Sequence, residues 1–142
     1  MAEALRPTIP VRLEKAEAGK LEAQGIDLII VGGPTHRHKV SATLEAVLDS
    51  APRQGLQGVK AAAFDTRYRL AAWLSGSAAK RIARHLHRLG AQVIVSPESF
   101  FMERDAPPKG QKRRHEVEHL EPGEVERAAA WAIKIAKAAG EN

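Results

Sequence analysis

The sequence predicts an α/β fold, a doubly wound parallel sheet with helices on both faces. The first observation is the apolar run Leu28–Val31, which ends at Gly32-Gly33-Pro34. A run this short, rich in β-branched side chains and stopped by glycine and proline, is typical of a strand buried on both faces. Strands of that kind belong to parallel sheets that are covered by helices.

The second observation is that strand-like and helix-like segments alternate after this central strand. In chain order we expect a helix at Ser41–Leu48 with Ser41 as its N-cap, a strand at Val59–Phe64, a helix at Ser77–Leu89 ended by Gly90, a strand at Gln92–Val95 and a helix at Gly123–Ala139. Right-handed crossovers between parallel strands place such helices on both faces of the sheet.

Ahead of the central strand the pattern is weaker. Residues 1–7 are expected to form a flexible tail, and Thr8–Leu13 a short strand. Glu14–Gly25 is polar and rich in Ala and Glu, which favours a turn and a helical stretch. One domain over residues 8–140 is therefore expected, since a chain of 142 residues buries a substantial core.

Composition excludes several classes of function. The absence of cysteine excludes disulfides, thiolate metal sites and a cysteine nucleophile, and fits a reducing compartment. No apolar run is long enough for a membrane span, so we expect a cytoplasmic protein with no membrane partner. The net charge of +5 favours acidic partners, but no nucleic-acid-binding motif is present and specific nucleic-acid binding is not expected.

Candidate binding residues follow the predicted strands. In parallel α/β sheets, ligands bind just outside the carboxyl ends of the strands. The candidates at this edge are Gly33, Pro34, Thr35 and His36 after the central strand, Asp65, Thr66, Arg67 and Tyr68 after the next strand, and Gly76 before the following helix. Glycine lets the backbone approach a ligand closely, and Pro34 stiffens its loop.

Five segments in this order resemble the flavodoxin family. They are Ile26–His36, Val59–Arg67, Ser75–Ala79, Ser96–Phe101 and Leu120–Ala128, and the resemblance covers roughly residues 8 to 140. It implies a flavodoxin-like sheet that binds flavin mononucleotide (FMN) and carries electrons between redox partner proteins, and the basic charge of this chain favours partners with acidic surfaces. An electron carrier is implied rather than a true enzyme, since in such proteins the cofactor does the chemistry.

The chain departs from that family at its beginning. The family's first strand, its Ser/Thr-x-Thr-Gly-x-Thr phosphate loop and its first helix are absent, and Thr8–Leu13 aligns with the family's second strand. The domain is thus expected to be N-terminally truncated relative to the family, with weak FMN binding. The central strand is then expected to have an open edge, through which two copies of the chain pair as a homodimer. Flavodoxins are also typically acidic, unlike this chain.

Each candidate has a functional and a structural interpretation. Thr35 is expected to hydrogen-bond the flavin ring, and Tyr68 or Trp73 to cover it, although Trp73 fits a core anchor equally well. Arg67 would neutralise the phosphate of FMN on the functional interpretation, and on the structural one it is simply exposed to solvent. Ser75-Gly76-Ser77 would offer N–H groups to an anion or merely cap the following helix.

Two further motifs favour the structural interpretation. His115-Glu-Val-Glu-His119 matches the His-Glu-x-x-His zinc pattern, but its alternating polarity is not that of a helix, and we regard the match as chance. Lys109–Arg114 is a cluster of charges that fits a solvated loop better than a docking patch for an acidic redox partner.

Two other functions remain open on the sequence. One is a cofactor-free flavodoxin-like module for protein interaction or regulation, which the missing phosphate loop favours. The other is a flavin-dependent quinone reductase, which would also need a nicotinamide site that the sequence does not reveal.

Overall fold

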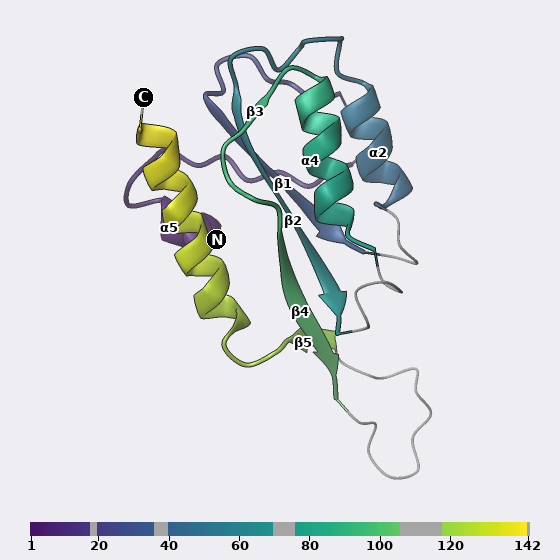
Figure 1. The fold of residues 1–142 in the computed structure, drawn as a ribbon, viewed down its shortest axis with the longest axis vertical. Helices are drawn as coiled ribbons and strands as arrows, with labels where there is room; N and C mark the ends of the chain where they lie inside the picture. Colours follow the sequence, from purple (N-terminus) through teal and green to yellow (C-terminus); the bar gives the residue numbers. More distant parts are fainter. Residues whose placement is uncertain (18–19, 36–39, 70–75, 106–117, 142) are drawn as a thin grey trace.

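The structure, a computed structural model, describes residues 1–17, 20–35, 40–69, 76–105 and 118–141. Its elements, in chain order, are α1 (Ala2–Leu5), β1 (Leu28–Pro34), α2 (Ala42–Asp49), β2 (Lys60–Tyr68), α4 (Ala78–Arg88), β3 (Gln92–Val93), β4 (Glu98–Arg104), β5 (Glu118–Leu120) and α5 (Glu124–Gly140). Figure 1 shows them coloured along the chain. Among the described helices, none combines the length and the apolar character needed to cross a bilayer.

The sheet is mostly parallel, with the strand order β1-β2-β4-β5. β1 and β4 run parallel to β2 on either side of it, whereas the short β5 is antiparallel to β4. β3 pairs with the start of β2 and β4 with its end, and the pairing register slips by two residues between them. Pro97, which has no N–H to donate, lies in this interruption, and the strand predicted at Gln92–Val95 covers only Gln92–Val93.

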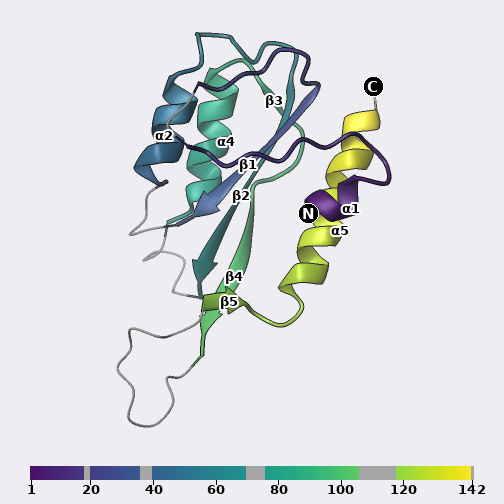
Figure 2. The ribbon, with the colours of Figure 1, turned by 180° about the vertical axis from the view of Figure 1, so that it is seen from behind.

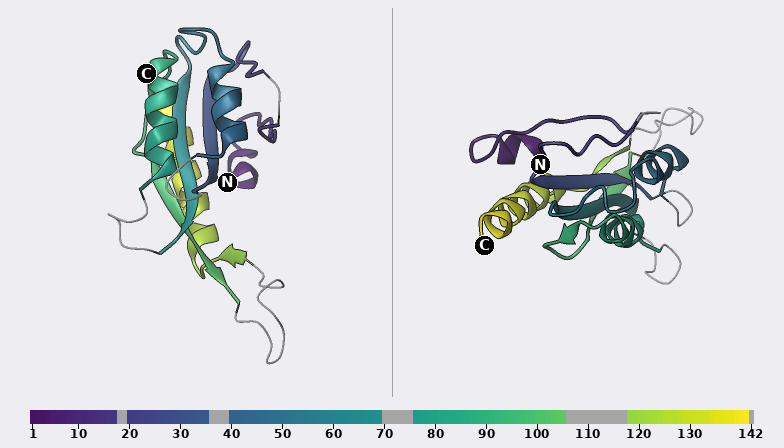
Figure 3. Two further views of the ribbon diagram at one scale, coloured as in Figure 1. Left: turned by 90° about the vertical axis from the view of Figure 1, so that its right-hand side faces the viewer. Right: turned by 90° about the horizontal axis from the view of Figure 1, so that it is seen from above.

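Helices cover both faces of the sheet, as predicted. α2 and α4 pack on one face, and α5 with the small α1 lies on the other (Figures 1 and 3). The core on the α2 and α4 side is aliphatic, with Val31, Leu44, Ile82 and Leu86 among its buried residues. The core on the α5 side contains Phe64, Phe100 and Trp131, whose rings meet edge to face with centroids 5.9–6.0 Å apart. The mixed α/β architecture is therefore confirmed.

The predicted helix boundaries follow from capping residues. Ser41 Oγ accepts from the N–H of Leu44 at the start of α2, and Ser77 Oγ accepts from the N–H of Lys80 at the start of α4. Gly90, with φ +95°, ends the segment after α4, because that backbone conformation suits glycine and few other residues. Both N-caps agree with the sequence-based prediction, with Ser77 as the cap of α4.

The N-terminal expectations were wrong in part. Thr8–Leu13 forms no strand, and the side chain of Leu13 is 74% exposed. Pro7 and Pro10 flank and interrupt this segment, and neither has a backbone N–H for a strand ladder. Within the expected tail, residues 2–5 form α1, whose Leu5 is buried. Figures 2 and 3 show the N-terminal coil running past the edge of β1 that faces away from β2.

The strand after the central one is longer than predicted. Asp65–Tyr68, expected in a loop, continues β2, because each of these residues pairs with β4 in the register Asp65↔Ser99 to Tyr68↔Met102. This correction moves four candidate binding residues from a loop into the end of a strand. Their side chains therefore alternate between the two faces of the sheet.

Candidate functional site

The carboxyl ends of β1 and β2 lie side by side. Gly33 is in register with Asp65, and Pro34 with Thr66. Just past β1, the N–H of Thr35 donates to the carbonyl of Thr66 over 2.9 Å. The fold thus brings together candidates from both predicted strands at one edge of the sheet, as the rule for parallel α/β sheets predicts.

Asp65 is the centre of this edge. Its side chain is 0% exposed, which is rare for a carboxylate without several hydrogen bonds. Oδ2 accepts from Thr35 Oγ1 over 3.0 Å, from Ser77 Oγ over 3.1 Å and from the N–H of Ala79 over 3.0 Å. The second oxygen, Oδ1, is buried with no hydrogen-bond partner among the described residues.

The same carboxylate completes the first turn of α4. Besides the Ala79 N–H held by Asp65, the N–H of Ala78 points at Thr35 Oγ1 over 3.3 Å and the N–H of Lys80 at Ser77 Oγ. Free N–H groups and the helix dipole make a helix N-terminus attractive to anions. Here the three donors are all taken by the chain's own side chains. The first turn of α4 is therefore capped internally, which for Ser77 is the structural interpretation.

Arg67 is directed toward the segment before α4. Its Nη1 donates to the carbonyl of Gly76 over 2.7 Å, and its guanidinium lies 5.7 Å from the ring centroid of Phe101. Arg67 is half-buried rather than fully exposed. It therefore ties the end of β2 to the residue that precedes the N-cap of α4.

Tyr68 is held by the neighbouring strand. Its hydroxyl accepts from Arg104 Nε over 2.6 Å, and the Arg104 guanidinium lies 4.6 Å from the ring centroid. Burial, with a smaller contribution from a hydrogen bond to Glu118, raises the pKa of the Tyr68 phenol. One face of the ring is thus covered by Arg104 and is not available to a ligand.

A second buried carboxylate, Glu124, was not singled out from the sequence. Glu124 Oε2 accepts from the N–H of Phe101 over 2.8 Å and from Arg127 Nη2 over 2.6 Å, and Arg127 also donates to the carbonyl of Ser99. The hydrogen bond from Arg127 is the main cause that lowers the pKa of Glu124, and Glu124 in turn raises the pKa of Arg127. The pair fastens the first turn of α5 to β4. An acid followed by a base three residues later was its only signal in the sequence.

His119 lies in β5 and not in a helix. Its Nε2 is 3.1 Å from Glu103 Oε1 on β4, directly across the antiparallel ladder. The zinc pattern needs two histidines one helical turn apart, and a strand at Glu118–Leu120 does not supply that spacing. His115 lies outside the described residues.

Several other candidates also lie outside the described part of the chain. They are His36, Trp73, Ser75 and Lys109–Arg114. Of the predicted site residues, the structure brings together Gly33, Pro34, Thr35, Asp65, Thr66, Arg67 and Gly76, and it places Tyr68 at the far end of β2, toward β4.

Comparison of the chain with protein-family models and with curated protein sequences found no match.

Proposed function

We propose that this chain is a flavodoxin-like electron-transfer protein that binds FMN at the edge formed by the carboxyl ends of β1 and β2. The observation that carries the proposal is the pairing of Thr35 with Asp65 and Thr66 there. It supports a binding role because two adjacent strand ends, one of them rich in glycine and proline, meet where ligands bind in parallel sheets. Bound FMN would supply the electron-transfer chemistry.

The two parts of FMN fit this edge unequally. The flat ring suits the exposed Pro34 at the end of β1. The phosphate has no place at α4, because Thr35, Asp65 and Ser77 already accept from the first-turn N–H groups and Asp65 adds a negative charge there. We therefore expect the chain to hold FMN mainly by its ring. The dissociation constant should be micromolar or higher, which corresponds to a binding free energy no more favourable than roughly −8 kcal/mol.

The test is a fluorescence titration of FMN with the purified chain and two matched variants. Pro34→Glu places a carboxylate at the proposed ring site, and Pro10→Glu makes the same change at an exposed proline of the N-terminal coil. We expect quenching by the unaltered chain and by Pro10→Glu, and a dissociation constant about tenfold higher for Pro34→Glu. Equal quenching by all three proteins would place the flavin elsewhere.

The cofactor-free alternative is favoured by one specific observation. Asp65 closes the anion-binding end of α4, as expected for a module that has no phosphate to bind. In that case the unaltered chain would leave FMN fluorescence unchanged even at roughly millimolar protein, where the weakest specific sites are occupied.

A further inference from the structure

The outer face of α4 carries an unusual density of positive charge. The helix reads Ala-Ala-Lys-Arg-Ile-Ala-Arg-His-Leu-His-Arg and contains no acidic residue. Its apolar residues face the sheet, with Ile82 and Leu86 fully buried, whereas Lys80, Arg81, Arg84 and Arg88 are exposed. Helical spacing therefore gathers these four cations on one side.

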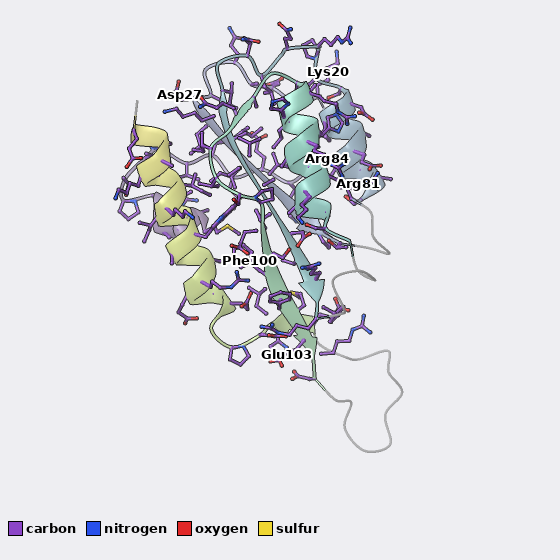
Figure 4. The ribbon with its side chains drawn as sticks, viewed as in Figure 1. Lys20, Asp27, Arg81, Arg84, Phe100 and Glu103 are labelled. Atoms are coloured by element: carbon purple, nitrogen blue, oxygen red, sulfur yellow. The ribbon has the colours of Figure 1, made fainter. Side chains whose placement is uncertain are left out.

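Only part of this charge is neutralised by neighbouring residues. Arg81 lies 3.5 Å from Glu45 and His85 lies 3.2 Å from Asp49, and both acids belong to α2. Within the described part of the chain, Lys80, Arg84 and Arg88 make no ion pair with a carboxylate. Figure 4 shows Arg81 and Arg84 along the part of α4 that lies beside α2. Of the cations without such a pair, Arg84 and Arg88 border the junction of the two helices.

A groove of about 520 Å³ runs between α2 and α4 at this junction. Arg81, Arg84 and Arg88 line its α4 wall, Glu45 lines its α2 wall, and Val40 and Leu48 lie at its floor. Val40 and Leu48 are almost completely buried, and the accessible surface of the groove is about equally polar and apolar. An occupant can therefore be recognised by its charge along the α4 wall and can also make apolar contacts in the groove.

We propose that this groove docks a carboxylate-rich segment of a partner protein, which lies along α4. Charge complementarity with Arg84 and Arg88 selects carboxylates, and a peptide can keep its acids on the α4 side only. A nucleic-acid strand, with phosphates throughout, would also meet Glu45 and Asp49 on α2. Moreover, the groove is lined by no Phe, Tyr or Trp, so bases would find only the smaller imidazole rings of His85 and His87 to stack on. The proposal goes beyond flavin binding and does not depend on it.

The test is fluorescence anisotropy of a labelled peptide of glutamate and alanine, titrated without flavin at low salt. The test variant is Arg84→Glu with Arg88→Glu. The matched control is Lys134→Glu with Lys137→Glu, which makes the same charge change on exposed positions of α5, across the sheet. We expect the test variant to raise the dissociation constant about tenfold, since several exposed charge pairs are lost, and the control about twofold or less.

Two additions keep the outcome decisive. The milder Arg84→Gln with Arg88→Gln removes the charges without reversing them, and should still weaken binding several-fold if the double glutamate variant fails to fold. A single-stranded DNA of equal charge is titrated in parallel. The proposal is overturned if the α4 and α5 variants lose the same affinity for the peptide, or if the peptide does not bind at low salt. It is also overturned if the DNA binds more tightly than the peptide and loses affinity with the α4 substitutions.

Discussion

Thr35 and Asp65 are joined by a hydrogen bond of 3.0 Å between Oγ1 and Oδ2, although they lie thirty residues apart in the chain. The bond links the end of β1 to the end of β2. Through the N–H groups of Ala78 and Ala79, which point at the same two side chains, it also links both strands to the start of α4. One buried carboxylate therefore holds three elements together at the candidate site.

Removing that carboxylate should destabilise the fold. Asp65→Ala leaves the partly buried hydroxyls of Thr35 and Ser77 and the buried N–H of Ala79 without their acceptor, and we expect a loss of about 3 kcal/mol of unfolding free energy. Asp65→Asn keeps an acceptor oxygen but removes the charge at the helix N-terminus, and should cost about 1–2 kcal/mol. Urea denaturation measures both. The exposed Asp49→Ala is the control, and a loss below about 1 kcal/mol for Asp65→Ala would refute this role.

The Glu124 carboxylate should make stability depend on pH. Arg127 and the N–H of Phe101 lower its pKa in the folded chain, so its contribution is fully present above the unfolded value of about 4.3 and is lost as pH falls through the folded value. At neutral pH, Glu124→Gln should cost roughly 1 kcal/mol, a modest figure because Arg127 is partly exposed. The difference from the unaltered chain should shrink below about pH 4.

The control for this pH dependence is Glu126→Gln, which removes an exposed acid from the same first turn of α5. Its unfolding free energy should follow that of the unaltered chain at every pH. If both variants lose the same stability and show the same pH profile, the effect is one of net charge and not of the Glu124–Arg127 pair.

Gly32 should tolerate no side chain. A Cβ at this position would overlap the ring of Phe64, which packs against Phe100 and Trp131. We expect Gly32→Ala to cost about 1–3 kcal/mol and to alter the near-ultraviolet circular dichroism of the aromatic core. Gly33→Ala is the matched neighbour, because its Cβ would lie 3.3 Å from the flexible end of Leu44. Equal melting temperatures for the two variants would contradict this packing.

The outer edge of β1 should promote self-association. In the described part of the chain β1 pairs with β2 alone, and the N-terminal coil that passes its other edge contributes no strand. Unpaired N–H and C=O groups of an apolar strand recruit other strands. We expect the sedimentation coefficient and the melting temperature to rise with protein concentration. A single monomeric species over the whole concentration range would argue against pairing through this edge.

The sequence predicted the local parts of the fold well and the long-range parts poorly. Ser41 and Ser77 were recognisable as N-caps because capping depends on residues three apart in the chain. The buried partners of Asp65 and the antiparallel strand Glu118–Leu120 were not predicted, because they depend on strand register and on segments far apart in sequence. Thr8–Leu13 had the alternation of a strand, but its prolines and the lack of a paired neighbour outweighed that preference.

The affinity of riboflavin relative to that of FMN tests the central claim most directly. If Asp65 closes the first turn of α4 and the flavin ring supplies the binding energy, removing the phosphate should change the affinity of the flavin for the chain only a little. Titrated into the unaltered chain under the same conditions, the two flavins should then quench with dissociation constants within about threefold of each other. FMN that binds more than about tenfold tighter than riboflavin would show that the chain does hold the phosphate, and no quenching by either flavin would contradict the ring site itself.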